Sequence, residues 1–349
     1  MARYDQKRND LIPYRRGRKK RNRIAPLCIG ILSAVIILTI GIILVSFLEK
    51  NSLHSQGDRQ NITGLKNESF GSEGNIEGAD IKINLENLNS PNAILIDADS
   101  GEVLAEHNSK EQIYPASMTK IMTAILTIEN CKDLSGTVTF TNELLTPLFT
   151  EGASMAGFQP GEQAELKDVL YGVILPSGAE CCEACAEAVA GSEERFVEMM
   201  NEKAKELGMN DTHFCNVTGL HDPKHISTVK DFSVLLKYAV ENEVFREIFT
   251  SSRHSMPPTD QHPDGFTVQS TMFQEIPDPD VTGGKILGGK TGYTEEAGLC
   301  LASMAEINGK EYILVTAHAR GNHFTEQFHI SDAVNVYNQI GEICASRSS

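Results

Sequence analysis

The sequence has no excess of positive charge beyond residue 23. Its formal net charge is −16, and ten of its 31 lysines and arginines fall within residues 1–23, together with only two of its 47 acidic residues. The rest of the chain therefore carries 21 basic and 45 acidic side chains. Such an acidic body argues against nucleic acid as a partner. The 349 residues allow one large domain or two ordinary ones, and no internal repeat is present.

The sequence also lacks the paired ligand spacing of a metal site. Three of its eight cysteines, Cys181, Cys182 and Cys185, share one expected helix, but no second ligand pair accompanies them. We interpret the three as small buried apolar residues. Cys28 lies in the apolar run described next, so seven cysteines remain elsewhere in the chain. The sequence does not assign disulfide pairs among them. No metal or cofactor is expected.

Charge is absent from residues 24–48, a run of 25 residues. This length is enough to span a bilayer as a tilted helix, and the basic residues before it predict a cytoplasmic N-terminus. No small-x-small cleavage site follows the run, so we expect an uncleaved single-pass anchor with the rest of the chain outside the cell. A cleaved signal peptide is the alternative.

The chain beyond this run is expected to contain a stalk and one folded domain. Residues 49–90 are rich in Asn, Ser, Gly and Glu and poor in large apolar residues, a composition that cannot bury a core. We therefore divide the protein into a basic cytoplasmic tail (1–23), a transmembrane anchor (24–48), a flexible stalk (49–90) and a catalytic domain (91–349).

Apolar periodicity within the domain predicts strands first, helices in the middle, strands again and a final helix. The Asn308-Gly309 pair predicts a tight turn between the last two strands. This order is typical of an α+β fold, with an antiparallel sheet flanked by helices and an inserted helical subdomain. The expected strands are 93–97, 102–106, 285–293, 298–307 and 310–317, and the expected helices are 117–130, 165–175, 179–190, 192–207, 231–239, 241–249 and 323–345.

One stretch has the pattern of a nucleophile and its base. Ser117 and Lys120 are three residues apart at the start of a predicted helix, so their side chains share one face. A serine hydroxyl needs a neighbouring base, and a lysine provides one if burial and nearby charge lower its pKa. The pair alone is a weak signal, because Ser-x-x-Lys is a short pattern that occurs by chance.

Two further elements strengthen the signal. Ser177-Gly178-Ala179 and Lys290-Thr291-Gly292 follow downstream, and the three elements together resemble the Ser-x-x-Lys, Ser-x-Asn and Lys-Thr-Gly motifs of penicillin-recognising serine enzymes. The flanking residues most resemble the serine D-alanyl-D-alanine carboxypeptidases, the low-molecular-mass penicillin-binding proteins. This likeness covers about residues 90–345 and implies a fold like that of penicillin-binding proteins and β-lactamases. Its other matching stretches are 115–120, 154–162, 212–222, 225–231 and 288–298.

The resemblance implies a role for each motif residue. Ser117 would attack the D-Ala–D-Ala carbonyl, Lys120 would take the serine proton, and Ser177 would pass a proton to the leaving amine. Lys290 would keep Lys120 neutral and attract the substrate carboxylate. Thr291 would hydrogen-bond that carboxylate, and Gly292 would let the strand backbone approach the substrate closely. The backbone N–H groups of Tyr293 and Ser117 would form an oxyanion hole. Arg320 is a candidate second anchor for the carboxylate.

Several residues near the motifs have other interpretations. Arg320 is equally well read as a solvated surface residue. His225 and Asp231 fit the family pattern, but we expect a loop contact from the first and a helix N-cap from the second. Ala179 and Met272 depart from the family, which tends to have Asn at both positions, so activity could be reduced or its substrate preference altered.

The expected function is removal of the terminal D-Ala from peptidoglycan stem pentapeptides or their lipid-linked precursors, with β-lactams as acylating inhibitors. The first alternative is a β-lactamase-like hydrolase, although no clear deacylating Glu-x-x-Leu-Asn follows the second motif. The second is a non-catalytic protein that binds cell wall or penicillin. A role in glycopeptide resistance is a variant of the carboxypeptidase hypothesis.

Overall fold

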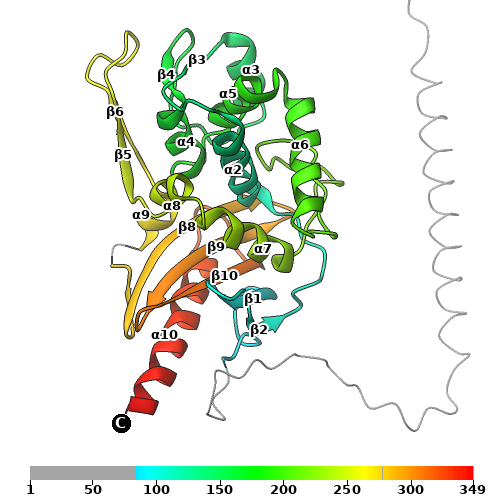
Figure 1. The fold of residues 1–349 in the computed structure, drawn as a ribbon, viewed down its shortest axis with the longest axis vertical. Coiled ribbons are helices and arrows are strands. Elements are labelled where there is room, and N and C mark those ends of the chain that lie inside the picture. The colour runs from blue at the N-terminus through cyan, green and yellow to red at the C-terminus, as the bar shows by residue number, and fades with distance from the viewer. Residues whose placement is uncertain (1–82, 277, 349) are drawn as a thin grey trace, which may run out of the picture. The chain divides into compact units, whose positions relative to one another are not determined.

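The computed structural model describes residues 83–276 and 278–348, and the structural statements below concern these residues. Their central element is a six-stranded antiparallel sheet with strand order β2-β1-β10-β9-β8-β7 (Figure 1). The first and last parts of the domain therefore meet in one sheet, as the sequence predicted. The strands are β1 (Asn92–Asp97), β2 (Val103–His107), β7 (Asp280–Val281), β8 (Gly284–Thr294), β9 (Gly298–Ile307) and β10 (Lys310–Ala319).

The helical subdomain lies in the chain between β2 and β7 and packs on one face of the sheet (Figure 1). Its expected helices are all present, to within a few residues at each end. The short α3 and α9 and the two-stranded sheets β3–β4 and β5–β6 were not expected. The elements are η1 (Ala116–Thr119), α2 (Lys120–Asn130), β3 (Thr137–Thr139), α3 (Asn142–Thr150), β4 (Gln163–Glu165), α4 (Leu166–Ile174), α5 (Ala179–Ala190), α6 (Glu193–Glu206), α7 (Val229–Val240), α8 (Glu243–Phe249), β5 (Arg253–Met256), β6 (Phe266–Gln269) and α9 (Thr271–Glu275).

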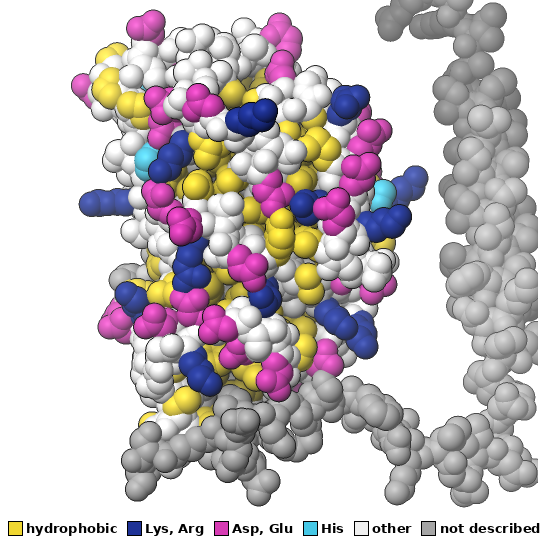
Figure 2. Space-filling model, viewed as in Figure 1, with side chains coloured by type: hydrophobic (Ala, Val, Ile, Leu, Met, Phe, Trp, Pro, Cys, Tyr) yellow, Lys and Arg dark blue, Asp and Glu magenta, His cyan; other side chains and the backbone are white. Residues whose placement is uncertain are grey.

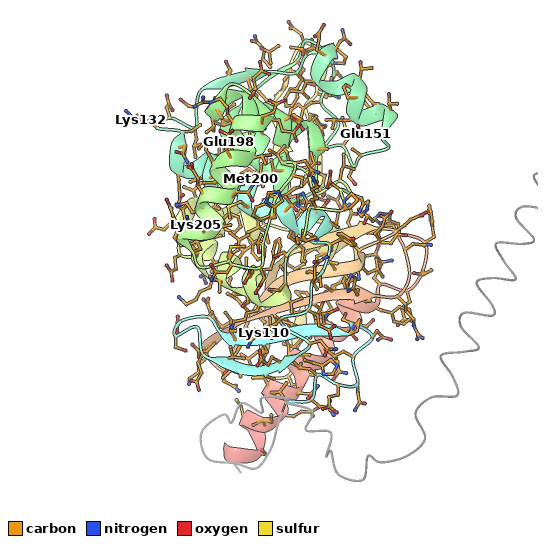
Figure 3. All side chains as sticks on the ribbon, turned by 90° about the vertical axis from the view of Figure 1, so that its right-hand side faces the viewer. Lys110, Lys132, Glu151, Glu198, Met200 and Lys205 are labelled. Carbon is orange, nitrogen blue, oxygen red and sulfur yellow. The ribbon has the colours of Figure 1, made fainter. Side chains whose placement is uncertain are left out.

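The sheet is buried on both faces because its strands alternate between two cores. Ile94 and Ile96 of β1 contribute to the core shared with the subdomain, whereas Leu95 contributes to a second core with α10 (Phe328–Ser348). Full burial of each such side chain is worth about 1.5–3 kcal/mol. In α6, Met200 is buried while Glu198 and Lys205 lie on the exposed side (Figure 3).

The predicted boundary between stalk and domain is too late in the chain. Ile83 and Leu85 lie within the expected stalk, yet both are buried in the core that contains α10. The Asp332 carboxylate of α10 accepts hydrogen bonds from the backbone nitrogens of Asn89 (2.9 Å) and Ser90 (2.8 Å). Residues 83–90 therefore pack against α10. The sequence did not predict this contact, because most of these residues are polar.

Two helix starts also differ from the sequence expectation. The last helix begins at Phe328 rather than 323, because residues 320–327 form a loop braced by its own side chains. The N-cap of α7 is Thr228, whose hydroxyl accepts from the Asp231 backbone nitrogen. Asp231 is instead in the first turn, where its carboxylate accepts from Thr212 Oγ1 at 2.7 Å.

The cysteine prediction is confirmed for the described residues. Cys181, Cys182 and Cys185 of α5 form no disulfide and are buried in the core. Burial raises the pKa of the Cys182 thiol to about 12. Within the described ranges no group of side chains could hold a metal ion.

The predicted tail, the predicted anchor (24–48) and most of the stalk lie outside the described residues. Among the helices that are described, none has both the length and the apolar character needed to cross a bilayer. On the face drawn in Figure 2, acidic and basic side chains are interspersed over the described residues.

Candidate active site

Ser117 lies in the short helix η1 at the edge of the sheet, directly before α2. The backbone approaches it from two sides. Ala116 has a positive φ of 47°, and a Cβ added to Gly219 would lie 1.9 Å from the Ala116 carbonyl oxygen. On the other side, a Cβ added to Gly292 of β8 would lie 3.0 Å from the Ser117 backbone nitrogen. Glycine is therefore required at 219, and the strand runs directly beside the Ser117 amide.

Lys120, the residue predicted as the base, contacts the Ser117 hydroxyl. Its ammonium nitrogen Nζ is 3.0 Å from Ser117 Oγ and 2.6 Å from the Thr218 carbonyl oxygen. The side chain is 2% exposed, and this burial lowers the pKa of Lys120. Nearby groups such as Cys182 and Glu180 act in the opposite direction but do not reverse the shift. A lowered pKa makes the neutral amine, the form that accepts a proton, more accessible.

Ser177 lies across from the pair in the turn before α5. Its φ is +66°, uncommon for a residue with a side chain, and it is 5% exposed. Its hydroxyl has no hydrogen-bond partner within the described part of the chain. The turn is held by the Gly178 nitrogen, which donates to the Gly172 carbonyl at 2.8 Å, and by the Ala179 nitrogen, which donates to Ser154 at 2.8 Å. The strained turn therefore holds Ser177 in a fixed position.

The third motif lies on β8 and divides into a buried and an accessible part. Lys290 is fully buried, and its ammonium donates to the Thr291 carbonyl at 2.8 Å. Burial, and secondarily the Lys120 charge, hold the pKa of Lys290 well below its usual range. The Thr291 hydroxyl shares a 2.6 Å hydrogen bond with the hydroxyl of Thr271. For Lys120, burial is likewise the main cause of its lowered pKa.

The motifs converge on a cavity of about 250 Å³. Five of the eight predicted site residues line it, namely Ser117, Ser177, Thr291, Gly292 and Tyr293. Lys120 and Lys290 lie behind its wall. Its other lining residues are Ser154, Thr271, Gln274, Glu275, Leu299, His323, Gln327, His329 and Ile330. A larger cavity of about 650 Å³ beside α3 and α5 contains none of the predicted site residues, so we assign the chemistry to the smaller one.

Arg320 is not among the residues that line this cavity. It is exposed, and its guanidinium carbon lies 4.7 Å from the centre of the Phe328 ring. The sequence did not point to His323 and His329, which do line the cavity. Both lie in the span predicted as the last helix, but only His329 is helical, in the first turn of α10, whereas His323 lies in the loop before it.

The two departures from the family motifs have structural explanations. Met272 is fully buried, and its sulfur is 2.3 Å from the position that a Cβ on Gly289 would take, so it fills the space behind β8. Ala179 is buried at the first position of α5. The next residue, Glu180, accepts hydrogen bonds from the backbone nitrogens of Ala156 (2.7 Å) and Gly157 (2.9 Å). Burial raises the pKa of Glu180.

His225 is a structural residue, as its interpretation from sequence expected. One ring nitrogen, Nδ1, accepts from the Cys215 backbone nitrogen at 3.2 Å, and the other, Nε2, contacts Thr119 Oγ1 at 2.8 Å. Burial lowers the pKa of His225 to about 4. Both nitrogens are therefore used to hold the loop before Thr218 against η1.

The fold is that of the penicillin-binding protein and β-lactamase class. A Streptomyces DD-transpeptidase structure superposes with a TM-score of 0.66 at 24% identity, over 72% of this chain and 97% of that one. A D-alanyl-D-alanine carboxypeptidase structure from Mycobacterium tuberculosis has a TM-score of 0.62 at 25% identity, over 72% and 90% of the two chains.

Sequence comparison places the chain within that class. The profile of the D-alanyl-D-alanine carboxypeptidase family matches residues 80–321, and the chain belongs to this family. It is 35% identical to the D-alanyl-D-alanine carboxypeptidase DacF of Bacillus subtilis, over 64% of this chain and 56% of DacF. It is 30% identical to the D-alanyl-D-alanine carboxypeptidase DacB2 of Mycobacterium tuberculosis, over 63% and 72% of the two chains. The alignment therefore spans little more than half the length of DacF.

Proposed function

We propose that the protein is a serine D-alanyl-D-alanine carboxypeptidase that removes the terminal D-Ala from peptidoglycan stem peptides. The observation that carries the proposal is the 3.0 Å contact between Lys120 Nζ and Ser117 Oγ, at a cavity that Ser177 and Thr291 also line. Family membership supports the same reaction. The non-catalytic alternative is disfavoured, because a buried lysine with a lowered pKa beside a serine is a costly arrangement that a simple binding site does not require.

The reaction has two steps. Neutral Lys120 takes the Ser117 proton as Oγ attacks the penultimate D-Ala carbonyl, and the peptide bond then breaks to leave an ester on Ser117. The departing amine of the terminal D-Ala receives a proton through Ser177. In the second step water attacks the ester, one proton returns to Ser117, and the shortened peptide leaves as a carboxylate.

The negative charge that develops on the carbonyl oxygen needs backbone donors. We assign this role to the amides of Ser117 and Tyr293. A Cβ built on Gly292 would lie 3.0 Å from the Ser117 nitrogen, so the strand that carries Tyr293 runs beside that amide. Removing one such donor typically lowers kcat by 10²–10³-fold, about 3–4 kcal/mol.

We also propose a cellular setting, based on the charge pattern of the sequence. The substrates we propose are stem pentapeptides or their lipid-linked precursors on the outer side of the membrane, with the catalytic domain anchored by residues 24–48. β-Lactams, which resemble the terminal dipeptide, would acylate the same serine. Removal of terminal D-Ala serves wall maturation, and it would also destroy the target of glycopeptide antibiotics.

Release of D-Ala from a peptide ending in D-Ala–D-Ala tests the proposal. We expect release by the full-length protein and none by Ser117→Ala. Thermal unfolding of the variant at the wild-type temperature would show that its fold is intact. A nitrocefin assay run in parallel covers the β-lactamase alternative, since turnover of nitrocefin without release of D-Ala would contradict the proposal.

A further inference from the structure

Glu180 is a buried carboxylate that the proposed reaction does not use. It is the second residue of α5, three residues after Ser177, and it is 0% exposed. Its oxygen Oε1 accepts two backbone hydrogen bonds, whereas Oε2 has no hydrogen-bond partner among the described residues. A buried polar oxygen without a partner lowers stability, so its presence directly after the second motif requires an explanation.

The two backbone nitrogens that bind Glu180 belong to a segment of one cavity wall. They are those of Ala156, at 2.7 Å, and Gly157, at 2.9 Å. Both residues lie in the 153–159 segment, which forms neither helix nor strand and therefore lacks a regular backbone hydrogen-bond pattern. Ser154 of the same segment lines the reactive cavity. Glu180 thus joins one wall of this cavity to α5.

The 153–159 segment also supports the turn of the second motif. The Ala179 nitrogen donates to the Ser154 carbonyl at 2.8 Å. A Cβ added to Gly178 would lie 2.8 Å from the Ala156 Cβ and 3.0 Å from the Ala156 nitrogen, so the turn and the segment are in direct contact. Any movement of the segment away from Glu180 would therefore remove support from the turn.

Ser177 depends on this support, because no side chain holds its hydroxyl. Its φ of +66° is unfavourable for a residue with a Cβ, so the surrounding contacts must maintain it. The Ser177 hydroxyl makes no hydrogen bond within the described part of the chain, whereas Lys120 Nζ lies 3.0 Å from the Ser117 hydroxyl. The position of the Ser177 hydroxyl is therefore set by its backbone.

We propose that Glu180 is a positioning residue for Ser177: its carboxylate holds the 153–159 segment against the turn and thereby keeps the Ser177 hydroxyl where it can protonate the leaving amine. This inference rests on the proposed function. Glu180 acts through the backbone, since it is not among the residues that line the cavity. The competing explanation is that Glu180 stabilises only the start of α5, where Gly178 provides no side-chain cap.

The test compares two substrates that differ in whether the leaving group needs a proton. One peptide ends in D-Ala–D-Ala, and the other ends in D-Ala–D-thiolactate, which has a thioester in place of the last peptide bond. The amine must be protonated to leave, whereas a thiol, with a pKa of about 8.5, leaves as the thiolate. Both substrates form the same ester on Ser117, so the ratio of their kcat/KM values reports the acylation step.

We measure this ratio at pH 7 for the full-length protein, from the release of D-Ala and of thiol. Because both substrates are assayed on one preparation, the ratio does not depend on the fraction of the protein that is folded. Ser177→Ala should lower the peptide-to-thioester ratio about 10²–10⁴-fold, the usual contribution of proton transfer by a side chain.

Glu180→Ala should lower the same ratio about 10- to 100-fold, since a misplacement of about 1 Å costs up to about 100-fold. Glu180→Gln keeps an oxygen for the two N–H groups and should give a ratio close to that of wild type. If Glu180→Ala does not fold, Glu180→Asp takes its place, because its shorter side chain draws the carboxylate away from the segment.

Glu187→Ala is the matched control for loss of a carboxylate from α5. Glu187 is exposed and lines the larger cavity rather than the reactive one. Its removal leaves the contacts of the 153–159 segment in place. This variant should therefore have the wild-type ratio.

The outcomes separate the inference from the function on which it rests. If wild type releases no D-Ala from the peptide, the proposed carboxypeptidase function is itself contradicted. If wild type is active and Glu180→Ala slows both substrates equally, Glu180 serves stability alone and the inference is overturned. An unchanged ratio in Ser177→Ala, or a ratio in Glu180→Gln as low as in Glu180→Ala, would also overturn it.

Discussion

Gly219 provides a test of how tightly the nucleophile is positioned. Its φ is +82°, and an added Cβ would lie 1.9 Å from the carbonyl oxygen of Ala116 and 3.0 Å from the nitrogen of Ser117. Ordinary contact begins near 3.4 Å, so Gly219→Ala must move the peptide group before Ser117 by about 1.5 Å or distort the 218–219 loop. Either movement would disturb the contact of Lys120 with Thr218.

We expect this substitution to slow acylation by a labelled penicillin about 100-fold or more, since a misplacement of 1 Å costs about that much. Overpacking should also lower the free energy of unfolding by about 1–3 kcal/mol beyond the cost of the left-handed backbone itself. Acylation is followed by gel fluorescence under conditions in which circular dichroism shows the variant to be folded.

Gly208→Ala is the matched control for this experiment. Gly208 has a φ of +76°, nearly that of Gly219, but an added Cβ would have no atom within 4 Å. Gly208→Ala should therefore lose only the stability that backbone strain costs, about 1–2 kcal/mol, and should be acylated at the wild-type rate. Acylation by folded Gly219→Ala at the rate of this control would refute the reasoning.

Three further predictions concern stability, measured by urea unfolding. The pKa of His225 is about 4 in the folded protein and ordinarily 6.5, so between these pH values the unfolded chain binds more protons than the folded one. Up to about 3 kcal/mol of stability should therefore be lost as pH falls from 6.5 to 4. The stability of His225→Gln should depend less steeply on pH, and equal slopes for the two proteins would contradict this. Leu85→Ala should lower the free energy of unfolding by about 2–5 kcal/mol without slowing acylation. A negligible loss of stability would show that residue 85 is not part of the core. Glu180→Ala leaves two backbone N–H groups without an acceptor and should lower the free energy of unfolding by about 2–4 kcal/mol. Glu180→Gln keeps an oxygen at this place and should lower it less. The reverse order would show that Glu180 does not act as the acceptor for these groups.

The sequence predicted the fold well because its local signals agree with the tertiary structure. The strands 285–293, 298–307 and 310–317 carry strong apolar runs, and Asn308-Gly309 has the positive φ angles that the tight turn requires. Signals were weakest where short elements depend on tertiary contacts. Residues 83–90 read as a stalk because their few apolar side chains are buried by a helix more than 240 residues later in the chain.

The site residues that belong to sequence motifs could be predicted, and the others could not. Ser117, Lys120 and Ser177 were assigned from spacing and resemblance, and the structure brings them together at one cavity or directly behind its wall. His323 has no motif in this sequence, since its position depends on a loop that replaces the expected start of the last helix. Arg320 was chosen for its charge and its place after β10, but sequence could not show that its side chain packs on Phe328.

The central claim is that Ser117 is the nucleophile and Lys120 its base. Incubation of the full-length protein with a penicillin, followed by proteolysis and mass spectrometry, tests this claim most directly. We predict one penicillin adduct, on the peptide that contains Ser117, absent from Ser117→Ala and formed at least 100-fold more slowly by Lys120→Met. An adduct on another serine, or no adduct at all on the folded wild-type protein, would contradict the account.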